Sequence, residues 1–239
     1  PVILFFMITG ALFYPAARAG FRRVHWPAFA IKRIFRIYPL VLFSILLVAG
    51  LLWANSGFVT DAPILRETAA NLAVWASFTG QPPLFGDPHA KFANAGVFWT
   101  LEVELLFYLA VLPALALLRD LSRRLPAWVT PLWAVPIAAV LRWLLPGHAD
   151  FMIAFMLGMF MVEARERMRI ARFFQRGDVA AASLLLALAA IGLLPPPISD
   201  RTAFFYAPLL TCIVCGQSFG GLLAHRASLV LGEISFGIY

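Results

Sequence analysis

The sequence predicts an all-α protein that crosses a membrane several times, as a polytopic transmembrane helical bundle. Hydrophobic residues make up 62% of the 239 residues, whereas soluble domains usually hold about 45–50%. Charged residues make up only 13%, and the mean hydropathy is +0.86. This composition excludes a disordered chain, a small disulfide scaffold and a soluble basic protein that binds nucleic acid, so no nucleic acid is expected as a partner.

Eight apolar runs are candidates for membrane crossings. They cover residues 2–15, 38–54, 96–118, 128–145, 150–163, 179–197, 203–224 and 229–239. A transmembrane helix needs about 20 residues, so each crossing with its connection takes roughly 28 residues and the chain has room for about eight. A ninth run at 69–79 holds only 11 residues, which favours an interfacial or re-entrant segment.

The basic residues predict the orientation of these crossings. Fifteen of the 19 lysines and arginines lie in four connections: Arg18, Arg22, Arg23, Lys32, Arg33 and Arg36; Arg119, Arg123 and Arg124; Arg165, Arg167, Arg169, Arg172 and Arg176; and Arg226. If the eight longer runs each cross once, all fifteen fall on one side, which the positive-inside rule makes the cytoplasm. The outer connection 55–95 is then unusually long, and loops of that length are often functional.

The two ends of the chain predict a fragment of a longer protein. The sequence begins at Pro1 directly before an apolar run and stops at Tyr239 inside another. We therefore expect one membrane domain over residues 1–239, truncated at both ends.

The segment FWTLEVELLFYL places two carboxylates at the start of an apolar helix. Carboxylates inside a membrane are costly, and they usually serve a function or pair with another group. Thr100, Glu104 and Tyr108 follow a spacing of four and form one polar stripe, with Glu104 about 12 Å below the outer helix end. Such a carboxylate can accept a proton or orient a histidine, and the structural alternative is a pair with an Arg or His on another helix. Glu102 faces elsewhere and lies nearer the interface.

The segment KRIFRIYP places basic residues at the cytoplasmic start of a crossing. Arg33 and Arg36 share one helix face, with Lys32 beside them, and two guanidinium groups form a fork that suits phosphate or pyrophosphate. The alternative is a juxtamembrane basic segment that anchors to anionic lipid and sets the topology.

The remaining polar residues point to no specific chemistry. Cys212 and Cys215 form C-x-x-C in an apolar helix, where packing of small residues is the expected role, and Gly216 and Gly220 add a GxxxG pattern typical of close helix packing. Arg142 lies near an outer helix end, where it snorkels to the interface or contacts a partner or substrate. His148 and Asp150 lie in a short outer turn. The sequence holds no Gly-rich phosphate loop, no nucleophile elbow and no metal-ligand spacing.

Five segments in order resemble membrane acyltransferase family 3, which includes O-antigen and exopolysaccharide O-acetyltransferases. VILFFMITGAL resembles the family helix G-V-D-x-F-F-V-x-S-G-F-L, KRIFRIYP resembles R-R-x-x-R-I-x-P, and FWTLEVELLFYL resembles W-S-L-S-V-E-x-x-F-Y-L. FMLGM (Phe155 to Met159) and LGEISFGIY (Leu231 to Tyr239) resemble F-L-L-G-M and L-G-x-I-S-Y-x-x-Y. Three positions depart from the pattern: Ile3 replaces an acidic residue, Glu102 replaces Ser, and Thr9 replaces Ser.

The resemblance implies a ten-helix core that moves an acyl group, by default acetyl, from cytoplasmic acyl-CoA to a sugar hydroxyl. The Ala- and Arg-rich composition indicates a bacterium, and in a Gram-negative one the inner membrane is the expected site. No metal is expected, because the sequence has no metal-ligand spacing. Carried over by position, Arg33 and Arg36, with Lys32, would hold the coenzyme phosphates, and Glu104 with Thr100 and Tyr108 would lie at the catalytic centre. Trp99, Glu102 and Arg142 are the expected substrate contacts. The family's proposed catalytic histidine, in an Arg-x10-His motif, would precede Pro1, so we expect this fragment alone to be inactive.

The expected geometry places the two motifs apart, with the arginines at the cytoplasmic face and Glu104 in the outer half of the membrane. There, Glu104 would orient or charge the upstream histidine, which would act as general base on the acceptor hydroxyl. Two other functions remain open from the sequence. One is a transporter or glycan-export subunit, in which Glu104 and Arg142 relay protons or contact substrate. The other is a catalytically inactive scaffold, which the loss of the acid at Ile3 favours.

Overall fold

The structure, a computed structural model, describes residues 2–58, 60–93, 98–144, 151–193 and 200–231. Most of these residues are helical, and there is no β-strand among them. They form two compact units: one holds Pro1–Phe21 and Ala114–Tyr239, and the other holds Arg22–Pro113. The helices of the first unit are α1 (Val2–Ala19), α5 (Leu112–Leu121, which begins in the second unit), η4 (Ala127–Trp133), α6 (Ala134–Leu144), α7 (Met152–Glu166), α8 (Met168–Phe174), α9 (Gly177–Leu193) and α10 (Asp200–Val214).

The unit Arg22–Pro113 is built around one long helix. After the short turn η1 (Phe21–Arg23), α2 runs from Trp26 to Asn55, about 45 Å at 1.5 Å per residue. Its start is fixed by His25, whose Nδ1 accepts a hydrogen bond from the Ala28 backbone N–H at 3.2 Å, and by a proline in the first turn, where a missing N–H does no harm. The basic segment predicted as a connection up to residue 37 is therefore mostly helical.

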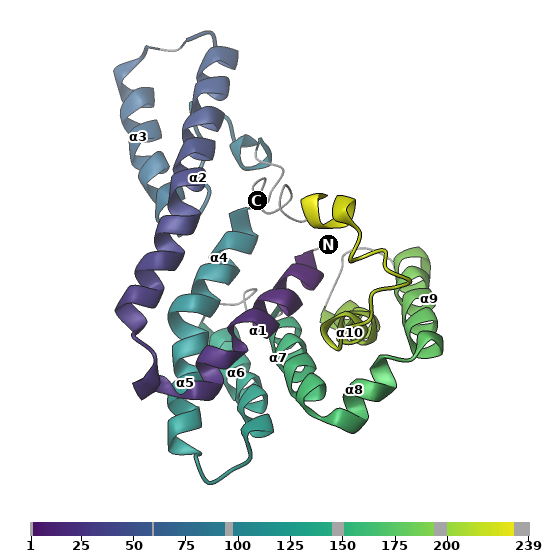
Figure 1. Cartoon of the computed structure of the whole chain (residues 1–239). Coiled ribbons are helices and arrows are strands. Elements are labelled where there is room, and N and C mark those ends of the chain that lie inside the picture. Colours follow the sequence, from purple (N-terminus) through teal and green to yellow (C-terminus); the bar gives the residue numbers. More distant parts are fainter. Residues whose placement is uncertain (1, 59, 94–97, 145–150, 194–199, 232–239) are drawn as a thin grey trace. The chain divides into compact units, whose positions relative to one another are not determined.

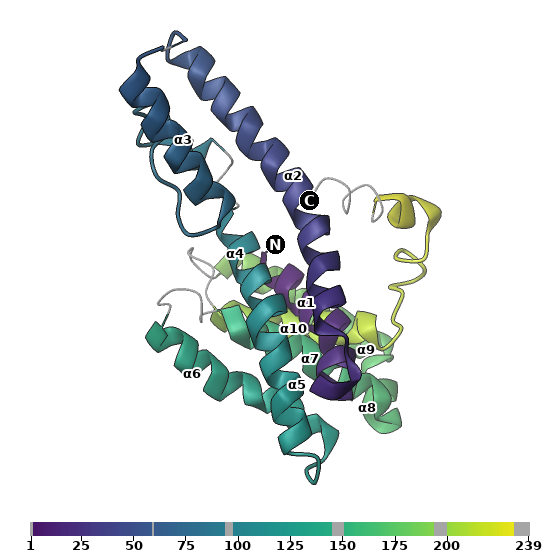
Figure 2. The ribbon, with the colours of Figure 1, turned by 90° about the vertical axis from the view of Figure 1, so that its left-hand side faces the viewer.

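The described residues of the connection 55–95, which the sequence predicts as an outer loop, form helices and tight turns. The connection contains α3 (Ala62–Ala76) and the turn η2 (Ala90–Phe92), and α3 lies alongside α2 in both views (Figures 1 and 2). The segment after α3 folds back on it: the Trp75 indole donates to the Pro82 carbonyl at 2.9 Å, and the Asn71 amide donates to the Pro83 carbonyl at 2.7 Å. The apolar core of this unit joins the two helices to the loop through Val41, Ile45, Val48, Trp75, Leu84, Ala90 and Phe98.

The helix with the two carboxylates has an irregular turn in its middle. It runs through α4 (Phe98–Leu106), the π-helical turn η3 (Phe107–Val111) and α5. In the π turn the Leu112 N–H donates to the Phe107 carbonyl five residues back. Pro113 explains the irregularity, because it has no N–H for the carbonyl of Leu109 and its ring clashes with that carbonyl. Turns of this kind occur frequently at functional sites.

In the other unit, α1 and α7 pack most closely, at two glycines. A Cβ at Gly10 would collide with the backbone of Phe155, and a Cβ at Gly158 would collide with the backbone of Met7. The expectation that Gly216 and Gly220 provide close helix packing is wrong. Both have positive φ angles and follow the end of α10 at Val214, so they shape a turn that favours glycine.

The structure confirms the all-helical, multi-pass membrane character, but it identifies fewer candidate spans than the eight predicted from the sequence. Among the described residues, four helices are long and apolar enough to cross a membrane, or five if α8 and α9, bent by 66°, form one broken span. Helices α7 and α10 have 15 residues each, about 22 Å, which is shorter than a hydrocarbon core of about 30 Å. Eight crossings remain a prediction. The run 203–224 is helical only to Val214, and most of the run 229–239 lies outside the described residues.

Candidate functional site

The predicted polar stripe lies on the buried face of its helix. Thr100 and Glu104 are buried on α4, and Tyr108 is buried in the π turn that follows. Glu104 is 8% exposed and Tyr108 is 3% exposed. The Tyr108 hydroxyl donates to Glu104 Oε1 at 2.6 Å, so the spacing of four brings these two groups into direct contact even though the helix is irregular at Tyr108.

The basic residues of α2 lie at the same place. The Arg33 guanidinium carbon is 5.9 Å from the centre of the Tyr108 ring and 5.6 Å from the centre of the Phe29 ring. Phe29 and Tyr108 meet edge to face, with 6.1 Å between ring centres. The positive charges of Arg33 and Arg36 both act on the Glu104 carboxyl group. These four side chains, which supply two cations, a carboxyl group and a phenol, all belong to the unit Arg22–Pro113.

The expectation that the arginines lie at the cytoplasmic face, apart from Glu104 in the outer half of the membrane, is therefore wrong. Two features of the fold explain the difference. Helix α2 begins at Trp26, so Arg33 and Arg36 lie about two to three turns inside it. Helix α4 begins beside the middle of α2, because Phe98 shares a core with Val41 and Ile45. Glu104 lies about 9 Å farther along α4 and so reaches the depth of the arginines.

The other predicted site residues are less enclosed. Lys32 is exposed on α2, Glu102 is half-buried on α4, and Trp99 on α4 is 38% exposed. Arg142 is exposed on α6 in the other unit. His148 and Asp150 lie outside the described residues. Cys212 and Cys215 are both buried and unbridged, and the Cys212 sulfur lies 3.7 Å from the Ser183 hydroxyl of α9.

Phe29 and Trp26, which complete the aromatic surroundings of Arg33, are not among the residues predicted from the sequence. Phe29 precedes Arg33 by one helical turn on α2, and Trp26 meets Phe29 edge to face at 5.6 Å. An aromatic residue four positions before an arginine on a helix is the pattern that predicts such a cation–π contact.

A second buried polar cluster, in the other unit, was also missed. The Tyr14 hydroxyl of α1 donates to Glu163 Oε1 of α7 at 2.5 Å and lies 3.1 Å from the Ala127 carbonyl. Arg18 pairs with Glu163 at 3.7 Å and also with Glu166. Glu163 lies at the end of an apolar run, and a carboxylate in such a segment usually pairs with another group. Its position is therefore the sequence feature that could have predicted this cluster.

The cluster of Arg33, Arg36, Glu104 and Tyr108 has a defined chemical capacity. Guanidinium groups bind phosphate and carboxylate anions through directed hydrogen bonds, and their charges act strongly where water is sparse. The carboxyl group beside them can hold or accept a proton. Within the described residues, no group of three or more His, Cys, Asp or Glu side chains is placed to hold a metal ion.

The comparison with protein families matches almost the whole sequence. A family described as an acyltransferase domain (Acyl_transf_3) covers residues 2–239. The chain belongs to membrane acyltransferase family 3. No curated protein and no solved structure matches it.

Family membership implies that the chain is a membrane acyltransferase. The structure explains two of its sequence motifs. Gly10 lies in VILFFMITGAL and Gly158 lies in FMLGM, and each contacts the backbone of the other helix. These motif glycines therefore permit the α1–α7 contact in this acyltransferase. Ile3, at the position where an acid was expected, is a buried apolar residue of α1.

Proposed function

We propose that the protein transfers an acyl group, by default acetyl, from cytoplasmic acyl-CoA to a hydroxyl of a carbohydrate such as O-antigen, exopolysaccharide or another glycan. The observation that carries this proposal is the cluster in which Arg33 lies over the Tyr108 ring and the Tyr108 hydroxyl donates to the buried Glu104 carboxyl group, in a member of an acyltransferase family. The protein would act in the inner membrane of a bacterium. Membrane lipid, acyl-CoA and a free or lipid-linked glycan would be its partners.

The donor would bind through the arginines of α2. Coenzyme A carries phosphate and pyrophosphate groups, which suit the planar fork of a guanidinium. Arg36 and Lys32 are exposed on α2 and are available to a phosphate that approaches from the cytoplasmic side. Arg33 is only half-exposed and is held between Phe29 and Tyr108. It would therefore hold the coenzyme A phosphate that lies deepest in the site, whereas the exposed residues make the first contact with the donor.

The transfer step requires a base for the acceptor. The hydroxyl oxygen attacks the thioester carbonyl carbon, a new C–O bond forms, the C–S bond breaks, and coenzyme A leaves as the thiolate. The proton of the hydroxyl passes to a base. Glu104 supports this step, either directly or by orienting a histidine on a neighbouring helix, and the Tyr108 hydroxyl fixes one of its oxygens. Thr100 lies one turn before Glu104 on the same face and would contact the acceptor.

The remaining predicted residues would recognise the acceptor. Trp99 exposes over a third of its surface on α4, and an indole ring presents an apolar face and a polar N–H to a sugar. Glu102 and Arg142 would supply hydrogen bonds to sugar hydroxyls.

The test is labelled acetyl transfer from acetyl-CoA into glycan, in membrane vesicles that contain the full-length protein. We expect Glu104→Gln to lower kcat by at least about 100-fold, the usual contribution of a positioned acid or base. We expect Arg33→Ala/Arg36→Ala mainly to raise the KM for acetyl-CoA, by about tenfold or more, because hydrogen bonds to charged groups contribute about 1.5–3 kcal/mol each.

Matched controls lie on α3 of the same unit. Glu67 and Arg66 are exposed there, so Glu67→Gln and Arg66→Ala repeat the chemical changes away from the cluster and should leave both constants near wild type. If wild-type vesicles transfer no label from acetyl-CoA or longer acyl-CoA donors, while a deletion strain fails to export a glycan, the enzyme proposal is overturned in favour of an export subunit.

A further inference from the structure

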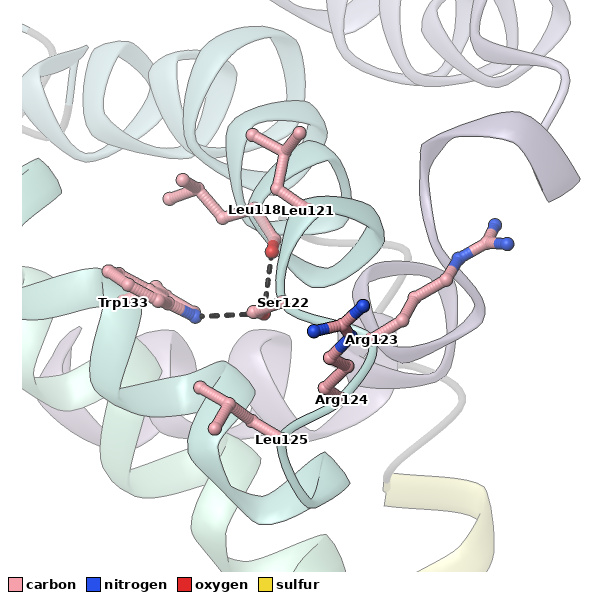
Figure 3. Close-up of a pocket in the computed structure, with 7 residues that line it drawn as sticks. All are labelled: Leu118, Leu121, Ser122, Arg123, Arg124, Leu125 and Trp133. Carbon is pink, nitrogen blue, oxygen red and sulfur yellow. Dashed lines mark hydrogen bonds between the residues drawn. The ribbon is translucent and has the colours of Figure 1, made fainter.

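A groove lies at the end of α5, in the unit that does not contain the Arg33–Glu104 cluster. Its volume is about 600 Å³, and four apolar side chains form its wall: Leu118, Leu121, Leu125 and Trp133 (Figure 3). Leu121 is 76% exposed. An exposed leucine beside a tryptophan provides apolar surface that contacts with the rest of the chain do not cover.

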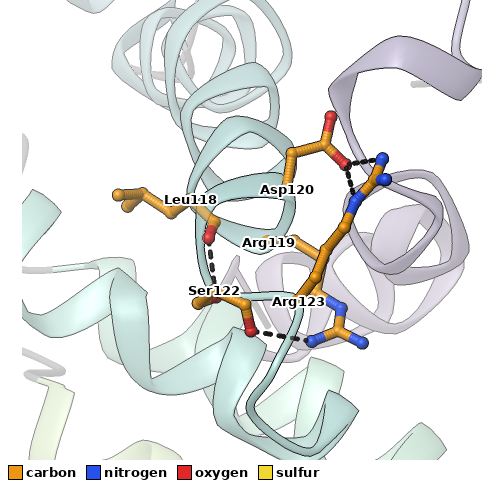
Figure 4. Close-up of polar contacts among 5 residues, drawn as sticks. All are labelled: Leu118, Arg119, Asp120, Ser122 and Arg123. Atoms are coloured by element: carbon orange, nitrogen blue, oxygen red, sulfur yellow. Dashed lines mark hydrogen bonds and ion pairs between the residues drawn. The ribbon is translucent and has the colours of Figure 1, made fainter.

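The groove is held in shape by hydrogen bonds through its central turn. The Ser122 hydroxyl donates to the Leu118 carbonyl at 2.6 Å and accepts from the Trp133 indole N–H at 3.3 Å. The Arg119 guanidinium donates to the Leu125 carbonyl at 2.8 Å and to the Ser122 carbonyl at 3.4 Å (Figure 4). These bonds join α5 to η4 and fix Trp133 opposite Leu118, so the groove exists without a ligand.

Two arginines line the same groove, and only one of them is balanced by an acid. Arg123 pairs with Asp120 at 2.8 Å (Figure 4). Arg124 is exposed, and no acidic side chain in the described part of the chain pairs with it. With Arg119 bound to backbone carbonyls, the turn carries three cations and one anion. The groove therefore combines an apolar wall with excess positive charge.

The position of the groove in the membrane identifies the matching ligand. The turn 122–126 joins two candidate spans, Phe98–Leu121 and Ala127–Leu144. It therefore lies at the membrane surface, on the side that the basic connections assign to the cytoplasm. Phosphate head groups and the first carbons of acyl chains occupy that depth, and basic residues there attract anionic lipids.

We propose that this groove binds one anionic phospholipid of the cytoplasmic leaflet. The lipid phosphate contacts Arg124 and the outer edge of Arg123, and one acyl chain lies against Leu118, Leu121, Leu125 and Trp133. A free phosphate would use only the arginines and leave the apolar wall exposed. The proposal does not depend on the transferase activity, because it rests on the charge and shape of the turn and on its position between two candidate spans.

The test is native mass spectrometry of the full-length protein with added phosphatidylglycerol or phosphatidylcholine. We expect wild type to retain phosphatidylglycerol in preference to phosphatidylcholine. Arg124→Ala should weaken phosphatidylglycerol retention about tenfold, because a hydrogen bond to a charged group is lost, and Arg124→Lys should keep part of it. Arg172→Ala, which removes an exposed arginine of α8, is the control and should retain the lipid as wild type does.

Further measurements separate the sources of the phosphate. Leu121→Ser keeps the charges of the groove and removes apolar contact. It should therefore weaken the binding of phosphatidylglycerol but not the binding of inorganic phosphate. Thermal unfolding of each variant verifies that the fold is retained. Equal retention of both lipids by wild type, or no effect of Arg124→Ala in a folded protein, overturns the proposal. So does displacement of the lipid by acyl-CoA at equal concentration, which would make the groove a donor site.

Discussion

The carboxyl group of Glu104 has its hydroxyl partner on its own helix and its cationic neighbours on another. Tyr108 donates to it at 2.6 Å, and the charges of Arg33 and Arg36 reach it from α2. Because Arg33 also lies against the Tyr108 ring, the phenol links the carboxyl group to the guanidinium. A buried network of this kind acts as a unit, so changes to its members are not expected to add.

This coupling predicts the result of a double-mutant cycle on kcat. Tyr108→Phe should lower kcat by about tenfold or more, because a hydrogen bond to a charged group is lost. In Glu104→Gln, the same change should have little further effect, because the carboxylate that the phenol held is already gone. Tyr38→Phe is the control, since the Tyr38 ring packs edge to face on Phe78 in the same unit. Additive effects of the two changes would show that Tyr108 does not act through Glu104.

Among the elements, α1 and α7 show how sequence motifs become a packing surface. Gly10 and Gly158 each occupy a point where the partner helix leaves no space for a Cβ. Close backbone approach of this kind is typical of small residues between membrane helices. The C-terminal ends of the same two helices are joined by the Tyr14–Glu163 hydrogen bond and the pairing of Arg18 with Glu163. The contact is therefore tight in the middle and polar at one end.

We expect Gly10→Ala and Gly158→Ala to destabilise the protein, because an added methyl must displace backbone rather than a flexible side chain. Overpacking of this kind costs about 1–3 kcal/mol, and each kcal/mol lowers the thermal midpoint by about 2–4 °C in a chain of this size. Gly192→Ala on α9 is the matched control, since a Cβ there meets no atom within 4 Å. It should keep or raise the midpoint, because alanine favours a helix over glycine by up to about 1 kcal/mol. Equal midpoints for all three variants would contradict the packing role.

For the molecule as a whole, the composition and the positions of the basic residues were sufficient to predict an all-helical membrane protein. Long apolar runs must form helices inside lipid, because no water is there to pair with the backbone, and basic residues stay in the connections outside it. The depth of individual residues was not predictable from apolar runs. The sequence places Arg33 at a helix start, but α2 begins seven residues earlier at Trp26, so Arg33 and Glu104 share one cluster. Glu163 was overlooked because its partners, Tyr14 and Arg18, are distant in sequence. Contacts of this kind depend on tertiary packing.

The remaining question at this scale is whether α7 crosses the membrane, and labelling of introduced cysteines decides it. Between the outer loop at His89 and α8 at Arg172 lie the spans Phe98–Leu121 and Ala127–Leu144 and the short helix α7. If α7 crosses, three crossings separate the two positions and they face opposite sides. If α7 does not cross, two crossings separate them and they face the same side. The positive-inside rule favours the first outcome, because it keeps the five arginines of residues 165–176 in the cytoplasm with Arg124.

We therefore expect a membrane-impermeant maleimide to label His89→Cys in intact cells, and to label Arg172→Cys and Arg124→Cys only after the membrane is opened. All three side chains are exposed, and the native Cys212 and Cys215 are buried, so the wild-type background should be low. Arg124→Cys is the internal control, because a single crossing separates it from His89 in either arrangement. Labelling of Arg172→Cys in intact cells that leave Arg124→Cys unlabelled would show that α7 does not cross. Its length of about 22 Å would then mark it as a helix held inside the protein, against α1, rather than a span.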